Sequence, residues 1–144
     1  MVSMGIHVQR LKTRAQFQAT LAGSTVSRSA HFALHRLMLD DVAPESQPPA
    51  GPEALRQQAL FVVRDIWVGA MVPKRWAKRA VTRNAIKRQI YNVSAEFATR
   101  LPMAAHVVRL RAGYDRKHFV SAQSDALKQA VRTELQQLFA RVAA

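Results

Sequence analysis

Seven lysine and arginine side chains fall within the fifteen positions from Lys74 to Arg88 of this 144-residue chain. No aspartate or glutamate lies between Ile66 and Ala95 to neutralise them. In a helix, each pair of like charges four residues apart costs about 0.2–0.5 kcal/mol. The segment therefore gains no stability from its charges, and its folding needs another source of free energy.

A stripe of apolar residues supplies that free energy. Its members recur at spacings of four, three and four residues: Ile86, Ile90, Val93 and Phe97. This spacing is typical of one buried face of an α-helix, and we predict a helix from about 80 to 100 that Pro102 ends. Burial contributes about 1.5–3 kcal/mol for each large apolar side chain, which outweighs the repulsion.

The charge of the whole chain indicates the kind of partner. The formal net charge is +13, and it is unevenly spread: residues 1–39 carry five basic groups and no acid, whereas residues 40–65 carry five of the nine acids. A net charge of this size favours a polyanionic partner and says little about the fold.

Three absences narrow the class of protein further. The chain has no cysteine, which excludes disulfides and thiolate metal sites. No apolar run reaches the roughly 18 residues that span a bilayer, and residues 1–9 lack the apolar centre of a secretory signal. We expect a cytoplasmic protein without membrane association.

Sequence periodicity and turn residues give the remaining elements. Thr13 and Gln16 form a capping-box pattern, which predicts a first helix over 14–22 that Gly23 ends. We predict strands over 30–39 and 106–111, one long or two short strands over 60–72, and a last amphipathic helix from 121 or 124 to 142. Four prolines lie between 44 and 52, so residues 40–57 are interpreted as an exposed acidic connection.

These elements predict an α+β fold in a single domain, residues 1–144. The expected order is α-β-β-β-α-β-α, with a small mixed sheet of about four strands packed with helices.

The residue order within the basic segment resembles the signature of the bacterial ribonuclease P protein component. In that signature an alanine, an Arg-Asn pair, an aliphatic residue and two basic residues follow at fixed spacing, after a basic lead-in. The corresponding positions are Ala80, Arg83, Asn84, Ile86, Lys87 and Arg88, and the basic lead-in is Lys74, Arg75, Lys78 and Arg79. A weaker resemblance runs from Arg10 to the last helix and so covers nearly the whole chain.

The resemblance implies an RNA-binding subunit without catalytic residues or metal ligands of its own. Its partners would be the catalytic RNA of ribonuclease P, which hydrolyses precursor tRNA with Mg²⁺ and removes the 5′ leader, and the precursor tRNA itself; DNA is not expected. The family fold also implies an unusual left-handed βαβ crossover, against the usual handedness.

Two groups of site residues follow from the resemblance. The RNA-binding group is Lys74, Arg75, Lys78, Arg79, Arg83, Asn84, Lys87, Arg88 and Arg111. The group expected in a cleft for the leader is Phe17, Leu21, His31 and His35. Phe17 and Leu21 also fit a core pair on one helix face. Trp67 is expected to pack in the core, whereas Trp76 lies between cations and is the better candidate for RNA contact.

Some positions depart from the family pattern. Ala85 and Tyr91 stand where basic or small polar residues are common, which predicts a lighter RNA contact there. Leu21 replaces a frequent aromatic residue and leaves less surface for stacking a base, a contact worth about 1–3 kcal/mol.

Three alternative functions remain open. One is a protein that binds another structured RNA, such as rRNA or tRNA. Another is a protein nuclease with His31 and His35 as acid and base, although the sequence places no carboxylates beside them. The last is a basic helix that adsorbs to anionic membrane; its long apolar stripe instead favours packing against a protein core.

Overall fold

The computed structural model describes residues 8–38, 61, 65–114 and 125–142. Its elements in chain order are β1 (Val8–Arg10), α1 (Arg14–Leu21), β2 (Ser24–Arg28), β3 (Phe32–Met38), β4 (Ile66–Met71), α3 (Ala80–Glu96), the short 3₁₀ helix η1 (Ala98–Arg100), β5 (Ala104–Leu110) and α4 (Asp125–Ala140). The strands form one mixed sheet in the order β1-β4-β5-β3-β2. The predicted α+β class is confirmed.

The sheet has five strands in the described residues, not about four, because the prediction missed β1 and β2. β1 has three residues and pairs in parallel with β4, more than fifty positions away in the sequence. β2 has the sequence STVSR, and Ser27 is its one buried residue. Both are edge strands, where apolar alternation, the main sequence signal of a strand, is weak.

The first helix begins where the capping box predicts. The backbone N–H of Gln16 donates to the Thr13 hydroxyl over 3.1 Å, and the Gln16 side chain accepts from the Thr13 N–H over 3.1 Å. These reciprocal bonds satisfy two N–H groups that a helix start leaves unpaired. The helix ends at Leu21, two residues before Gly23.

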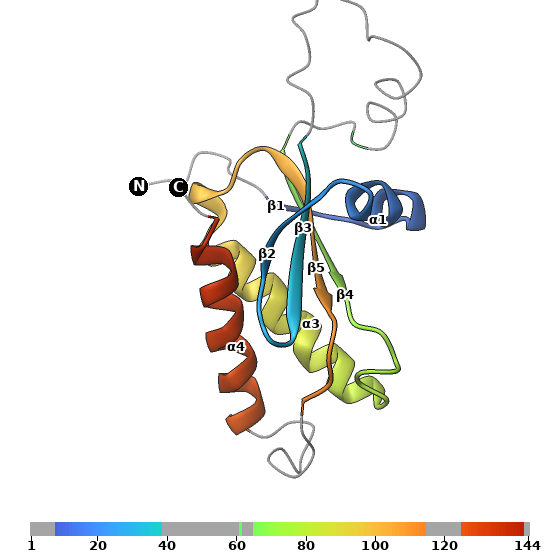
Figure 1. Cartoon of the computed structure of the whole chain (residues 1–144), viewed down its shortest axis with the longest axis vertical. Coiled ribbons are helices and arrows are strands. Elements are labelled where there is room, and N and C mark those ends of the chain that lie inside the picture. Colours follow the sequence, from blue (N-terminus) through green and yellow to red (C-terminus); the bar gives the residue numbers. More distant parts are fainter. Residues whose placement is uncertain (1–7, 39–60, 62–64, 115–124, 143–144) are drawn as a thin grey trace, which may run out of the picture.

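Helices cover both faces of the sheet. Figure 1 shows α1 apart from α3 and α4, which lie side by side across the sheet. The larger core lies between the sheet and the pair α3 and α4, and it includes the predicted apolar stripe with sheet residues Phe32, Leu34, Val68 and Val108. The smaller cluster lies under α1 and contains Trp67. Phe17 packs so closely there that a side chain at Gly69 would lie 2.6 Å from its ring.

β4, α3 and β5 form the crossover that the resemblance implied. β4 and β5 are adjacent and parallel. In Figure 1 both strands run downward with β5 on the left of β4 and α3 behind them, which is the left-handed sense. This connection makes α3 the link between the adjacent strands β4 and β5, so the sheet sets the position of its charged side chains.

Element ends differ from the predictions in small ways. α3 ends at Glu96, and the chain continues through Phe97 into η1. The 60–72 segment is strand from Ile66 to Met71. The proline-rich connection at 40–57, residues 62–64 and the predicted start of the last helix at 121–124 lie outside the described residues.

His106 makes the stability of this core depend on pH. The side chain is fully buried on β5. Its Nε2 accepts from Nε of Arg36 over 3.1 Å, and its Nδ1 lies 3.2 Å from the carbonyl oxygen of Trp67. Burial and then the charge of Arg36 lower the pKa of His106 from 6.5 to about 4. Between about pH 4 and pH 6.5, His106 is therefore protonated in the unfolded chain but neutral in the folded chain.

We predict that the free energy of unfolding is highest above pH 6.5 and falls as pH drops toward 4, by up to about 3 kcal/mol from this residue. Urea denaturation of wild type and His106→Gln at pH 7.5 and 5 measures the effect, because glutamine keeps a donor and an acceptor but does not titrate there. The loss between the two pH values should be smaller in the variant. Equal losses would mean that His106 is not the source.

Candidate nucleic-acid interface

The start of α3 is held by its own arginine. The residue before the helix, Arg79, has an extended backbone and makes no side-chain cap. Instead, Nη1 of Arg83 reaches back and donates to the carbonyl oxygens of Ala77 (3.1 Å) and Lys78 (2.8 Å). Arg83 thus fixes the loop that carries the cations of the basic lead-in.

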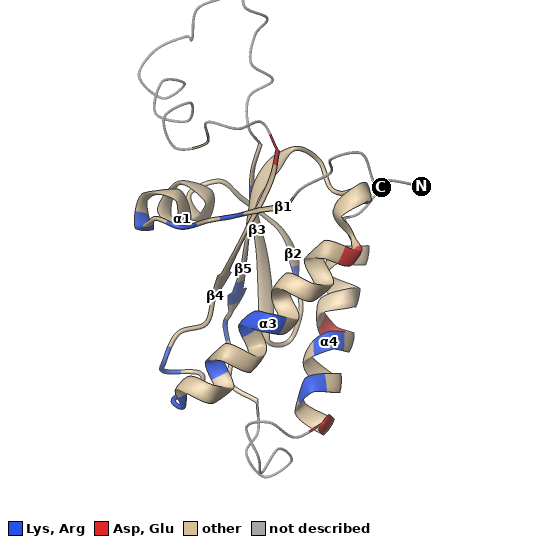
Figure 2. Cartoon of the chain, turned by 180° about the vertical axis from the view of Figure 1, so that it is seen from behind, with Lys and Arg blue, Asp and Glu red and all other residues tan. Residues whose placement is uncertain are grey.

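Within the described residues, the cations of the predicted RNA-binding group have no carboxylate partners. The exposed members of the group are Lys74, Arg75, Lys78, Arg79, Asn84 and Arg88, and Arg83 and Lys87 are half-buried. Figure 2 shows basic positions along the loop and the first part of α3, with an acidic position at the far end of the helix. Of the four carboxylates in the described residues, Glu96 pairs with Arg132 and Glu134 with His31. None of these four carboxylates pairs with a cation of Lys74–Arg88.

A shallow groove of about 290 Å³ adds a residue that sequence reasoning missed. It is lined by Arg10, Asn84, Lys87, Arg88, Tyr91 and Asn92. The guanidinium of Arg10 lies 4.1 Å from the centre of the Tyr91 ring, within the range of a cation–π contact. Tyr91 departs from the family pattern in lacking a charge, and Arg10 brings a charge to that position from β1. No local sequence pattern predicts that Arg10 lies beside Tyr91, because this contact depends on the pairing of β1 with β4.

Arg111 lies at the end of the sheet where the basic loop begins. Its Nε and Nη2 donate to the carbonyl oxygen of Ser29 over 3.0 and 2.7 Å, so it anchors the β2–β3 turn while remaining exposed. Two residues later, the backbone at Gly113 approaches Trp76 closely enough that a Cβ would lie 2.9 Å from the Trp76 carbonyl oxygen. This approach places the segment after Arg111 beside the lead-in loop.

The sheet face under α1 carries a second basic group. Phe17 and Leu21 pack on the small cluster of this face. His35 faces the same side, where its Nδ1 lies 3.1 Å from the Thr25 hydroxyl and its Nε2 accepts from Nε of Arg109 over 3.2 Å. Burial, and then the charges of Arg109 and Arg28, lower the pKa of His35. The neutral ring can thus hold the Arg109 guanidinium in place.

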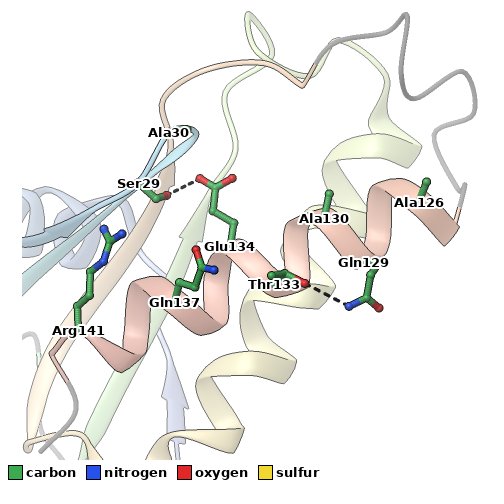
Figure 3. A pocket seen from close by; sticks show the side chains of 9 residues that line it. All are labelled: Ser29, Ala30, Ala126, Gln129, Ala130, Thr133, Glu134, Gln137 and Arg141. Carbon is green, nitrogen blue, oxygen red and sulfur yellow. Dashed lines mark hydrogen bonds between the residues drawn. The ribbon is translucent and has the colours of Figure 1, made fainter.

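His31 is not brought to this face. β3 begins at Phe32, so His31 lies before the strand and turns toward α4, where its Nδ1 lies 2.7 Å from Oε1 of Glu134. Its ring stacks on Tyr114 with centres 3.9 Å apart. Glu134 also accepts from the Ser29 hydroxyl at the edge of a depression of about 590 Å³ (Figure 3). Burial raises the pKa of Glu134, but hydrogen bonds from Ser29, His31 and Tyr114 hold it below its usual value.

The histidine pair of the nuclease alternative is therefore not formed, because His31 and His35 serve opposite faces of the sheet. Of the residues predicted for the leader cleft, Phe17, Leu21 and His35 lie on the sheet face under α1, where Thr25, Arg28 and Arg109 are near His35. Sequence reasoning missed Arg28 and Thr25 because it missed β2 altogether. The described residues also contain no cluster of three or more potential metal ligands from His, Cys, Asp and Glu, and no helix among them is both long and apolar enough to span a membrane.

An α+β fold that carries cations on the loop before α3 and the first part of α3, and has Arg28 and Arg109 near His35 on the opposite face of its sheet, suits a polyanionic partner. Comparison with known proteins identifies its class. The ribonuclease P family profile matches residues 7–142, and the chain belongs to the ribonuclease P protein family. A ribonuclease P protein component from Bordetella petrii is 32% identical over 133 residues, covering 92% of this chain and 90% of the relative. One from Ralstonia pickettii is 31% identical over 143 residues, covering 94% and 83%.

A solved structure shows the same fold at lower identity. The RNase P protein of Staphylococcus aureus aligns with a TM-score of 0.60 and 17% identity, covering 94% of this chain and 97% of that one. The order of strands and helices described above is therefore the architecture of that family.

The cations of Lys74–Arg88 predict a simple dependence of RNA binding on salt. Lys87→Ala should weaken binding to the catalytic RNA of ribonuclease P and lower the slope of log K against log salt by about 0.7–0.9, the value for one neutralised phosphate. The thermal midpoint should be nearly unchanged. Arg100→Gln is the matched control, because it removes one charge beyond the other end of α3. Binding titrations at several salt concentrations measure both, and equal losses would show that only total charge matters.

Proposed function

We propose that this chain binds the catalytic RNA of ribonuclease P through the α3 surface, defined as Lys74–Arg88 together with Arg10, and assists that RNA in removing the 5′ leader of precursor tRNA. The observation that supports this most directly is the row of cations without carboxylate partners in the described structure. The hydrolysis itself is assigned to the RNA with Mg²⁺ bound through it, and the site of action to the cytoplasm.

A bound RNA would remove the repulsion among the cations of this surface. Side chains such as Arg83 and Lys87 lie four residues apart on one helix face, where like charges repel. A phosphate backbone placed against them removes this repulsion and releases condensed counterions. The core under α3 holds the helix rigidly while this occurs, so the cations need little reorganisation on binding.

The face under α1 suits the single-stranded leader. Phe17 is half-buried at its edge and offers part of an aromatic ring to an unpaired base. Arg109 and Arg28 can contact the phosphates of the same strand, and neutral His35 orients Arg109. An apolar wall beside cations is the combination that binds single strands without reading their sequence.

Reconstitution of the enzyme from its protein and RNA tests whether the RNA carries out the cleavage. We expect the purified chain alone to leave precursor tRNA uncut, and the chain with the catalytic RNA and Mg²⁺ to cut it at the mature 5′ end. Gel analysis of end-labelled precursor gives the site of cutting. Cleavage by RNA-free protein would support the nuclease alternative instead.

The leader-binding face makes a separate prediction. Arg109→Gln should reduce the affinity of the reconstituted enzyme for precursor with a leader, about 10- to 150-fold for one lost hydrogen bond to a charged group, and leave its affinity for mature tRNA unchanged. Lys87→Ala is the matched control, because it removes a cation from the other face. A loss of the same size for both tRNAs would place Arg109 outside the leader site.

A further inference from the structure

Trp76 is an exposed aromatic side chain in the middle of the basic lead-in. Its exposed fraction is 37%, which places it among the few large apolar residues at the surface of the described structure. The other tryptophan, Trp67, is buried under α1. A tryptophan left partly in water forgoes some of the burial energy that a core position would give, so packing alone does not explain this position.

The backbone beneath Trp76 is fixed. The N–H groups of Trp76 and Ala77 donate to the carbonyl oxygen of Pro73 over 3.1 and 3.2 Å. Ala77 is buried in the main core, and Arg83 binds its carbonyl oxygen. On the other side, Gly113 leaves room for the Trp76 carbonyl. The tryptophan is thus presented on a preorganised turn, which lowers the entropy lost on binding.

One cation contacts the ring, and two more are close in the sequence. The Arg75 guanidinium lies 5.3 Å from its centre, and Lys74 and Lys78 are exposed within two residues on either side. Single-stranded nucleic acid is bound by this combination, in which an aromatic face stacks on a base and neighbouring cations contact the adjoining phosphates. A duplex offers no such contact along its length, because its bases are stacked on each other.

We propose that Trp76 stacks on an unpaired base of the catalytic RNA, with Lys74 and Lys78 against the flanking phosphates. This inference rests on the proposed function and deepens it, since it assigns an unpaired or helix-end nucleotide to this turn. The occupant is the catalytic RNA and not the leader, because the turn leads directly into the cationic face of α3. The leader face lies under α1, on the other side of the sheet.

Affinity measurements with the full chain and the catalytic RNA test the stacking. Trp76→Ala should raise the dissociation constant about 5- to 150-fold, the range for one lost base–aromatic stack, and leave the salt slope unchanged because no charge is removed. Trp76→Phe should bind better than Trp76→Leu, since both are apolar but only phenylalanine has a ring face. Met103→Ala is the matched control, as an exposed apolar residue outside this surface. Equal affinities for the phenylalanine and leucine variants would overturn the proposal.

Fluorescence gives a readout that does not depend on the alanine variant folding. Stacking on a base should quench the Trp76 emission, so addition of the catalytic RNA should quench wild type and leave Trp76→Phe nearly unaffected. Quenching by a leader oligonucleotide alone would contradict the assignment to the catalytic RNA. If wild type binds the RNA and Lys87→Ala weakens binding, but Trp76→Ala binds like wild type, only the stacking fails. If wild type does not bind the RNA, the proposed function itself fails.

Discussion

The burial of one apolar stripe against the sheet supports the rest of the structure. Ile86, Ile90 and Val93 are almost completely buried between α3, α4 and the strands. Their burial contributes about 1.5–3 kcal/mol for each side chain, which exceeds by several kcal/mol the repulsion among the cations of the opposite face. The protein therefore tolerates a charged surface whose cations have no carboxylate partner in the described residues. That surplus charge is available for a partner.

The sheet separates two basic surfaces with different chemistry. On the α3 side, the cations are carried by a helix and its lead-in loop, and Arg10 joins them from the edge strand. On the α1 side, Arg109 is held by His35 beside apolar residues. The first surface suits the phosphates of a folded RNA, and the second suits a single strand. The left-handed crossover through α3 fixes the two surfaces relative to each other.

Much of this arrangement could be predicted from the sequence. The capping box at Thr13 placed α1 within a residue of its observed bounds, and the spacing of Ile86, Ile90 and Val93 placed α3 and its buried face. These signals succeed because they are local. The Arg-Asn signature in the first part of α3 also predicted the family.

Contacts between distant segments could not be predicted in this way. The charge of Arg10 beside Tyr91 depends on a three-residue strand that pairs with β4, and the separation of His31 from His35 depends on where β3 begins. The sequence indicates Arg83 only as a phosphate ligand, yet its Nη1 holds two carbonyl oxygens of the preceding loop. A sequence pattern gives the type of side chain at a position. The role of that side chain depends on the residues from distant segments that the fold places next to it.

Directed hydroxyl-radical cleavage tests most directly whether the cationic face of α3 lies against the catalytic RNA. The chain has no cysteine, so a single Asn92→Cys substitution provides a unique attachment point for an iron chelate in the α3 groove. Thr99→Cys, exposed in η1 beyond the far end of the helix, serves as the comparison. If the RNA lies against α3, we expect strong, localised cutting of the bound RNA from position 92 and weak cutting from position 99. Cutting from position 99 alone would place the RNA elsewhere and contradict this expectation.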